Sequence, residues 1–461
     1  MKKRETGINL IILLANLFFY LVFFIADGVK LAVDSQSYIM GAYSREPLYP
    51  VLLWLFRIVF GENRYFFWVV LVQCLLAGVA AWRFTTVLRK KLELTWFPLL
   101  VVIGLQFAVI VMLRFVANRG STYCNSICSE GIAIPLFTLF ISELLLFVWE
   151  KKERNLLLTM LYAVALLSTR KQMYIVLAIM GIVYVSMFAA RRMNVKKCML
   201  AIATVAGALF LAVGADMLYN LVHRGEAMRH TTDSSALVIS TLYSSELEDA
   251  DYFADADMKN LFITIMTGIE EGEYSYQYAQ SGWMQLYNHY SDHYDNIAFD
   301  IVNPAFYAYI DSSGIYSDNE REKCFTQLNH EVLKTLLPVN WGQMAKVTMA
   351  NILTGFCNTV SKPHRFLNWY NALFYVLYII MLVRLVIKKQ NSSLFWCAFV
   401  VLIATVVNAG AVGVMIFAQS RYMIYNMPLI YVVLFLMLYF YTKEFLMKRK
   451  MPDKTGGMKE E

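Results

Sequence analysis

The chain has 461 residues, a hydrophobic fraction of 59% and a formal net charge of +7 at pH 7. Soluble globular proteins are about 45–50% apolar, so this composition excludes an ordinary soluble enzyme or binding domain. Many apolar runs reach roughly 18 residues, enough to span a bilayer core of about 30 Å. The first run lacks the small-residue cleavage site of a signal peptide, and further runs follow it. We therefore predict an all-α polytopic membrane protein without a nucleic-acid partner.

Taken in chain order, the sequence contains about ten apolar segments that qualify as membrane spans. The segment at 156–168 is the shortest, and it is retained because the charge pattern described next requires it. The predicted spans are Ile8–Ala26, Tyr65–Val87, Phe97–Leu113, Gly131–Val148, Leu156–Ser168, Met173–Ala190, Cys198–Ala215, Leu367–Ile387, Leu394–Phe417 and Ile424–Tyr441.

Lysine and arginine gather at alternate ends of these spans, which sets the predicted orientation. Cytoplasmic loops of membrane proteins carry an excess of these residues. We therefore predict a multi-pass protein of the cell inner (plasma) membrane with both termini in the cytoplasm. The clusters are Met1–Arg4, Arg89–Lys91, Lys151–Arg154, Arg191–Lys197, Arg384–Lys389 and Lys443–Lys450.

The same orientation divides the chain into four regions. We predict an N-terminal transmembrane catalytic module at 1–215, whose first external loop is 27–64, and an extracytoplasmic domain at 216–365. C-terminal transmembrane helices at 366–445 and a cytoplasmic tail at 446–461 complete the chain. All six histidines lie within 216–365, which is too rich in tyrosine and aspartate and too poor in glycine for a simple linker.

The first external loop carries a group of polar residues close to the end of the first span. Asp34 follows the first span by about eight residues, and Tyr38 comes one helical turn later. Arg45 and Glu46 precede a proline, which disfavours helix at Glu46. The apolar and aromatic stretch Leu48–Phe60 then predicts a helix that lies in the membrane interface.

These motifs resemble those of the GT-C superfamily of membrane glycosyltransferases, which includes protein O-mannosyltransferases and bacterial aminoarabinose transferases. Three further stretches share the resemblance: "CSEGIAIPLFTLF" at 128–140, "LLSTRKQMYIVLAIM" at 166–180 and "QSRYMIYNMPLIYV" at 419–432. The likeness covers 1–215 and 366–445, and 216–365 lies outside it. In the first loop it rests on Asp34, Ser35, Tyr38, Arg45, Pro47, Tyr49 and Pro50.

The resemblance implies transfer of a sugar from a polyprenyl-phosphate donor to an extracytoplasmic glycan, lipid or protein acceptor, with inversion at the anomeric carbon. Asp34 is then the general base, and Glu130 is a second catalytic residue or an acid that caps its helix. The donor phosphate meets Arg170, Lys171 and Arg421 at external span ends. We expect no cofactor, with a divalent metal ion left open because Glu130 provides a second acid.

The substrate-positioning residues implied by the resemblance are Tyr38, Arg45 and Glu46. We also expect Asp34, Glu130, Arg170 and Arg421 to line one cavity that opens to the external face and to lipid.

Other readings remain open on the sequence. A polysaccharide polymerase that uses a lipid-linked oligosaccharide needs similar features, and so does a flippase or transporter of lipid-linked saccharides. A membrane scaffold with a partner-binding external domain is a third alternative. His289 and His293 have the spacing of two zinc ligands on a helix, but a surface pair is favoured because the zincin glutamate position holds Tyr290.

Overall fold

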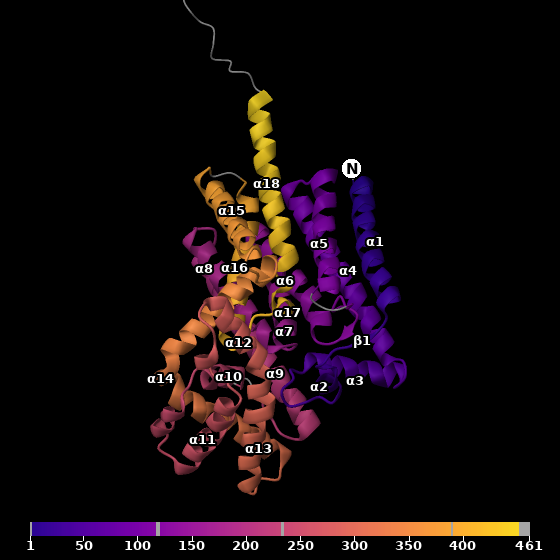
Figure 1. Ribbon diagram of the computed structural model, residues 1–461. Coiled ribbons are helices and arrows are strands. Elements are labelled where there is room, and N and C mark those ends of the chain that lie inside the picture. Colours follow the sequence, from indigo (N-terminus) through magenta and orange to yellow (C-terminus); the bar gives the residue numbers. More distant parts are fainter. Residues whose placement is uncertain (1, 117–119, 232–234, 389–390, 451–461) are drawn as a thin grey trace, which may run out of the picture.

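The computed structural model describes residues 2–116, 120–231, 235–388 and 391–450, and it confirms an all-helical architecture (Figure 1). All ten predicted spans are helical. Nine helical segments in the described part are long and apolar enough to cross a membrane, and the helix at the short predicted span 156–168 is not among them. Of the predicted tail, residues 451–461 lie outside the described chain. The membrane helices are α1 (Lys2–Asp27), α4 (Tyr65–Leu92), α5 (Trp96–Val116), α6 (Glu130–Glu150), α7 (Glu153–Leu167), α8 (Ile175–Ala189), α9 (Val195–Arg224), α15 (Leu367–Ile387), α16 (Ser392–Met415) and α18 (Met427–Lys450).

The short predicted span is α7, which has 15 residues and falls below ordinary spanning length. At about 1.5 Å per residue it covers only about 22 Å. It nevertheless returns the chain across the bundle, because Arg170, three residues after α7 ends, pairs with Glu130 at the start of α6. The short helix α7 is held in the bundle because it packs against both α6 and α9.

The described basic clusters lie together at one end of the bundle. Lys91 approaches Glu150 within 4.0 Å, and Lys197 donates to the backbone oxygen of Lys151. Arg192 bonds to Ser392 at 3.1 Å, which joins the α8–α9 turn to the start of α16. Helices α1 and α18 begin and end, respectively, at this same end (Figure 1). The cation pattern of the sequence therefore corresponds to one face of the molecule.

Short elements close the opposite end of the bundle. They are β1 (Lys30–Leu31), α2 (Ser35–Ile39), α3 (Leu48–Phe60), β2 (Ser126–Ile127) and α17 (Ser420–Met423). The two strands pair in parallel, so the first and second external loops are joined. Helix α3 is the predicted Leu48–Phe60 helix and runs across the direction of α1 (Figure 1). Its first N–H donates to the carbonyl oxygen of Ser168 after α7.

The segment after α9 forms a helical layer against the end that carries these loops (Figure 1). Helix α9 runs on past the predicted span end at 215, because no breaker occurs before Gly225, which adopts the left-handed conformation. The layer contains α10 (Ser235–Tyr243), η2 (Leu247–Tyr252), α11 (Ala256–Glu271), η3 (Tyr276–Tyr278), α12 (Trp283–Asp295), the π-helix η4 (Asn296–Val302), α13 (Asn303–Ser312) and α14 (Asp318–Val360).

The helical layer has a hydrophobic core of its own, which continues into α16. Tyr287, Tyr290 and Tyr294 on α12 are buried in it, whereas Tyr278 remains 43% exposed. Most of the tyrosines of this region are therefore packing residues. Helix α14, with 43 residues, extends from the layer into contact with α16 and fixes the layer on the membrane bundle.

Candidate functional site

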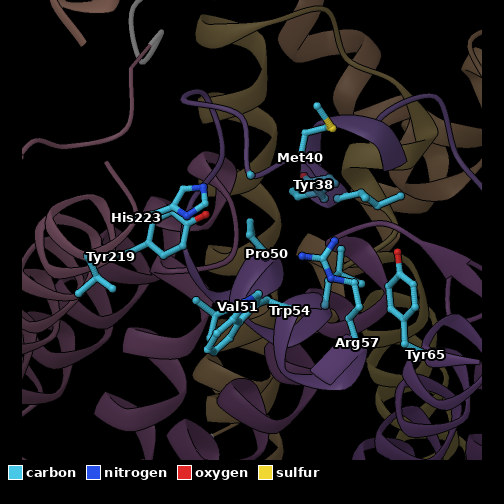
Figure 2. A pocket seen from close by; sticks show the side chains of 13 residues that line it. Tyr38, Met40, Pro50, Val51, Trp54, Arg57, Tyr65, Tyr219 and His223 are labelled. Carbon is cyan, nitrogen blue, oxygen red and sulfur yellow. The ribbon is translucent and has the colours of Figure 1, made fainter. Parts of the chain in front are cut away.

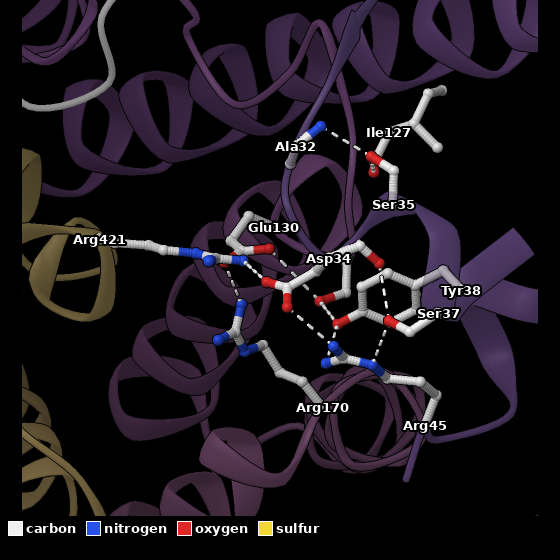
Figure 3. Close-up of polar contacts among 11 residues, drawn as sticks. Ala32, Asp34, Ser35, Ser37, Tyr38, Arg45, Ile127, Glu130, Arg170 and Arg421 are labelled. Atoms are coloured by element: carbon white, nitrogen blue, oxygen red, sulfur yellow. Dashed lines mark hydrogen bonds and ion pairs between the residues drawn. The ribbon is translucent and has the colours of Figure 1, made fainter. Parts of the chain in front are cut away.

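Asp34 lies at the start of α2 with both carboxylate oxygens paired to arginine (Figure 3). Its Oδ1 atom is 2.8 Å from Arg45, and its Oδ2 atom is 2.6 Å from Arg421. Ser35, the next residue, holds the loop in place: its hydroxyl donates to the carbonyl oxygen of Ile127 and accepts from the N–H of Ala32. The β1–β2 contact and α17 thus determine where Asp34 stands.

Glu130 forms the second half of the same cluster. It is the first residue of α6 and is fully buried, and its Oε1 atom pairs with Arg170 at 2.5 Å and also with Arg421. Arg421 therefore bridges the two carboxylates, as Figure 3 shows. As an acid in the first turn of α6, Glu130 also interacts favourably with the helix dipole, while Ser129 occupies the N-cap position.

The cluster carries more positive than negative charge. Three guanidinium groups face two carboxylates, which leaves one positive charge in excess. Burial alone raises the pKa of Asp34, but Arg421 and Arg45 outweigh it and hold that pKa below its usual value. The side chains of Asp34, Arg45 and Arg421 are 27%, 24% and 23% exposed, so a ligand can reach them. An anion is the ligand that this charge favours.

Tyr38 connects the two external loops at the base of the cluster. Its hydroxyl lies 2.7 Å from the Ser129 hydroxyl and accepts a hydrogen bond from Arg45 at 3.2 Å. The Arg45 guanidinium also stacks over the Tyr38 ring at 4.4 Å. Burial raises the pKa of Tyr38 to about 12, so the phenol stays protonated. Tyr38 and Arg45, both predicted to position a substrate, therefore contact each other, and Arg45 also pairs with the Asp34 carboxylate.

A large cavity of about 1060 Å³ lies between the bundle and the helical layer. Its walls come from the first external loop, η1 (Lys171–Tyr174), α8, α10, η4, α13, α14 and α16. Arg170 lines this cavity, but Asp34, Glu130 and Arg421 are not among the described residues that do so. The expectation that all four line one cavity was therefore wrong. The four side chains do gather, but Glu130 is buried behind Arg170, and Asp34 and Arg421 stand to one side.

A second, small apolar cavity of about 350 Å³ also has Tyr38 in its wall (Figure 2). It is bounded by α3, by the end of α2 and by the last turns of α9. Gly41 lines it with a positive φ of +60°, and a Cβ atom there would lie 2.7 Å from the Tyr219 hydroxyl. Tyr38, only 2% exposed, thus belongs to the walls of both cavities.

The other two predicted site residues face the large cavity. Lys171 donates to the carbonyl oxygen of Thr231 at 3.0 Å, and Glu46 is only 3% exposed. Sequence reasoning missed His230 and Asp216, whose side chains bond at 2.6 Å next to Glu46. Asp216 directly follows the predicted seventh span, Cys198–Ala215, and an acid at the edge of the membrane is a recognisable functional signal.

The two histidines with zinc-ligand spacing lie side by side on α12. His289 and His293 have ring centroids 4.6 Å apart on α12, and the His289 ring bonds to the Tyr243 hydroxyl. Within the described ranges, no three His, Cys, Asp or Glu side chains come together as metal ligands. Cys124 and Cys128 are both buried and unpaired.

No protein-family model matches the chain, and no curated protein matches it. Among solved structures, the chain is similar to ArnT from Cupriavidus metallidurans, in a crystal structure bound to undecaprenyl phosphate. The sequences are 12% identical, the TM-score is 0.32, and the similarity covers 97% of this chain and 82% of that chain.

Proposed function

We propose that this protein is a GT-C-type membrane glycosyltransferase that moves a sugar from a polyprenyl-phosphate donor to an extracytoplasmic acceptor. The observation that carries the proposal is the cluster of Asp34, Glu130, Arg45, Arg170 and Arg421. It unites the first, second and last external loops and has one positive charge in excess. It stands at the bundle end opposite the basic clusters, which corresponds to the extracytoplasmic face of the inner membrane.

The donor phosphate binds to arginine. Arg170 and Arg421 present guanidinium groups that suit two-point contacts with phosphate oxygens, and Lys171 adds a further positive charge from the cavity wall. Glu130 holds both arginines in place and reduces the positive charge that the fold has to bury. Because arginine already occupies both acids of the cluster, the proposed reaction uses no metal ion, and activity in the presence of a chelator tests this.

The small apolar cavity receives the start of the polyprenyl chain. Its walls include apolar residues of α3, among them Trp54, and Val222 of α9, and Arg57 of α3 also lines it. Burying such a chain is favourable at about 25 cal/mol per Å² of apolar surface. In this proposal the phosphate lies near Tyr38, which lines both cavities.

Asp34 is the general base in this proposal. Phosphate binding at Arg421 frees the Asp34 oxygen that this arginine holds at 2.6 Å, so base and donor are coupled. The acceptor hydroxyl gives its proton to Asp34 as its oxygen bonds to the anomeric carbon. The bond between that carbon and the phosphate oxygen breaks on the opposite side, so the centre inverts. The polyprenyl phosphate leaves as an anion stabilised by arginine.

Transfer of a radiolabelled sugar from polyprenyl phosphate by the purified protein in nanodiscs tests the proposal. A glycosyltransferase forms one new glycosidic bond per donor and releases polyprenyl phosphate. A polymerase lengthens a lipid-linked oligosaccharide instead, and a flippase moves the intact donor across sealed vesicles without breaking it. Either of these results, without single-sugar transfer, would refute the proposed reaction.

A further inference from the structure

Glu46 lines the large cavity, and one of its carboxylate oxygens has no hydrogen-bond donor. This Oε1 atom is buried in the cavity wall, and within the described part of the chain no group bonds to it. The His230 ring is beside it, but its Nε2 atom is 3.8 Å away, too far for a hydrogen bond. Unpaired buried carboxylate oxygens are rare because they lose their hydration without compensation. The arrangement points to a donor group that arrives with a ligand.

Asp216 holds the histidine that stands behind Glu46. Its Oδ2 atom lies 2.6 Å from His230 Nδ1 and also accepts the His230 backbone N–H at 3.0 Å. Asp216 and His230 are 3% and 5% exposed. The imidazole is therefore fixed at two points, with Nε2 directed towards Glu46. The pair thus fixes a ring nitrogen beside the Glu46 carboxylate, and neither Asp216 nor His230 is among the described residues that line the cavity.

The wall of the large cavity has the chemistry of a saccharide site. Aromatic rings of Tyr174, Phe299 and Tyr307 line it, with amide groups of Asn303 and Asn329 beside them. Rings stack on the C–H faces of sugars while amides and acids bond to their hydroxyl groups. The cavity volume also lies near the upper end of small-ligand sites, which hold about 300–1,000 Å³.

A π-helical turn before Pro304 positions part of the cavity wall. Pro304 lacks the N–H that an α-helix would direct to the carbonyl of Asp300, and its ring crowds that carbonyl. The chain widens into the π-helix η4 just before Pro304, and Phe299 on η4 lines the cavity although its side chain remains 62% exposed. Such π segments often occur at functional sites.

We propose that Glu46 accepts a hydrogen bond from a sugar hydroxyl in the large cavity and thereby selects a saccharide, with Asp216 and His230 as positioning residues. The inference rests on the proposed glycosyl transfer and deepens it. The sugar hydroxyl belongs either to the head group of the donor or to a saccharide acceptor, and the experiment distinguishes these sources.

The test uses saturation-transfer NMR on the whole protein in nanodiscs. The probes are soluble glucose, galactose, mannose, N-acetylglucosamine and maltose, with a serine tripeptide for comparison. Undecaprenyl phosphate and its glucose-loaded form are titrated separately. The wild type is expected to bind at least one saccharide and not the tripeptide. Glu46→Gln should weaken that binding roughly tenfold or more, because a charge-assisted hydrogen bond is lost.

Glu331→Gln is the control. Glu331 is not among the described residues that line the cavity, and its 54% exposed side chain pairs with Lys334 at 3.6 Å. The saccharide affinity of this variant should stay within about threefold of wild type. His230→Ala should weaken saccharide binding and also lower the unfolding temperature, because it leaves the buried Asp216 carboxylate without its partner, and His230→Gln should restore part of the binding. A purely structural histidine would lower the unfolding temperature without changing the saccharide affinity measured well below it.

Equal effects of Glu46→Gln and Glu331→Gln would overturn the assignment, as would an absence of binding for every soluble saccharide and for the sugar of a polyprenyl-phosphate donor. Binding of soluble sugars that depends on Glu46 identifies an acceptor saccharide, whereas dependence seen only with the lipid-linked sugar identifies the donor head group. If soluble saccharide binds through Glu46 while undecaprenyl phosphate does not bind, the saccharide site stands and the proposed donor fails.

Discussion

Arg421 lies 291 positions after Glu130 in the chain, yet its guanidinium group pairs with that fully buried carboxylate. The same guanidinium reaches Asp34 at 2.6 Å, so one side chain from the last external loop joins the first two. The position of α17 is thereby tied to the start of α6. Any ligand that draws Arg421 away affects both carboxylates together.

Glu130→Gln should destabilise the fold. It leaves Arg170, whose side chain is 13% exposed, without its carboxylate, and removal of one partner of a buried pair costs about 3–5 kcal/mol. Thermal unfolding in detergent measures the change. Glu62→Gln is the control, because the exposed pair of Glu62 with Arg57 at 3.7 Å is worth only about 0–1 kcal/mol. Similar unfolding temperatures for the two variants would contradict a structural role for the cluster.

The ion pairs of Asp34 should give a defined pH dependence of stability. Its pKa in the folded protein lies below the ordinary value of 3.8, because the effect of Arg421 and Arg45 exceeds that of burial. The stabilisation is therefore complete above that ordinary value and is lost as the pH falls through the lower folded pKa. The difference in unfolding temperature between wild type and Asp34→Asn should be constant above about pH 5 and shrink in more acidic buffer. A difference that already disappears near neutral pH would show that Asp34 is not held by arginine.

The apolar runs and the basic clusters were sufficient to predict the membrane helices and the alternation of their directions. Both patterns depend on whether a segment lies in lipid or in water. For the polar residues of the loops, the sequence predicted the candidates but not how they pair. Nothing in the order of the residues indicates that Arg45 and Arg421 divide the two oxygens of Asp34, since such pairing depends on how distant loops pack. His230 could not be distinguished from the other histidines, because its partner Asp216 lies on a helix that was expected to end one residue earlier.

The orientation of the molecule can be tested by cysteine labelling. Tyr252 and Val195 are 59% and 62% exposed at opposite ends of the fold, so each accepts a cysteine without disturbing the core. In intact cells an impermeant maleimide should label Tyr252→Cys, and it should label Val195→Cys only after the cells are opened. The unsubstituted protein gives the background from the half-buried Cys198 and Cys324. The reverse pattern would place the site on the cytoplasmic side and contradict the proposed transfer to an extracytoplasmic acceptor.

Arg170→Ala should weaken binding of undecaprenyl phosphate by roughly tenfold to a hundredfold, because a charge-assisted contact with the phosphate is removed. Ligand-dependent thermal stabilisation of the protein in nanodiscs provides the affinity. Lys334→Ala removes an exposed cation of the helical layer, whose side chain is 78% exposed, and should leave the affinity unchanged. Equal losses in the two variants would indicate a general charge effect instead of a phosphate site.

The most direct test of the central claim is sugar transfer by Asp34→Asn. Asparagine keeps the size of the side chain and one oxygen for Arg45 or Arg421, but it cannot take a proton. General base catalysis contributes about 10²–10⁴-fold, so turnover of a polyprenyl-phosphate sugar should fall by that factor while undecaprenyl phosphate still binds. Retention of more than about half of the wild-type turnover, against a loss of roughly 10² or more, would contradict the assignment of Asp34 as the base.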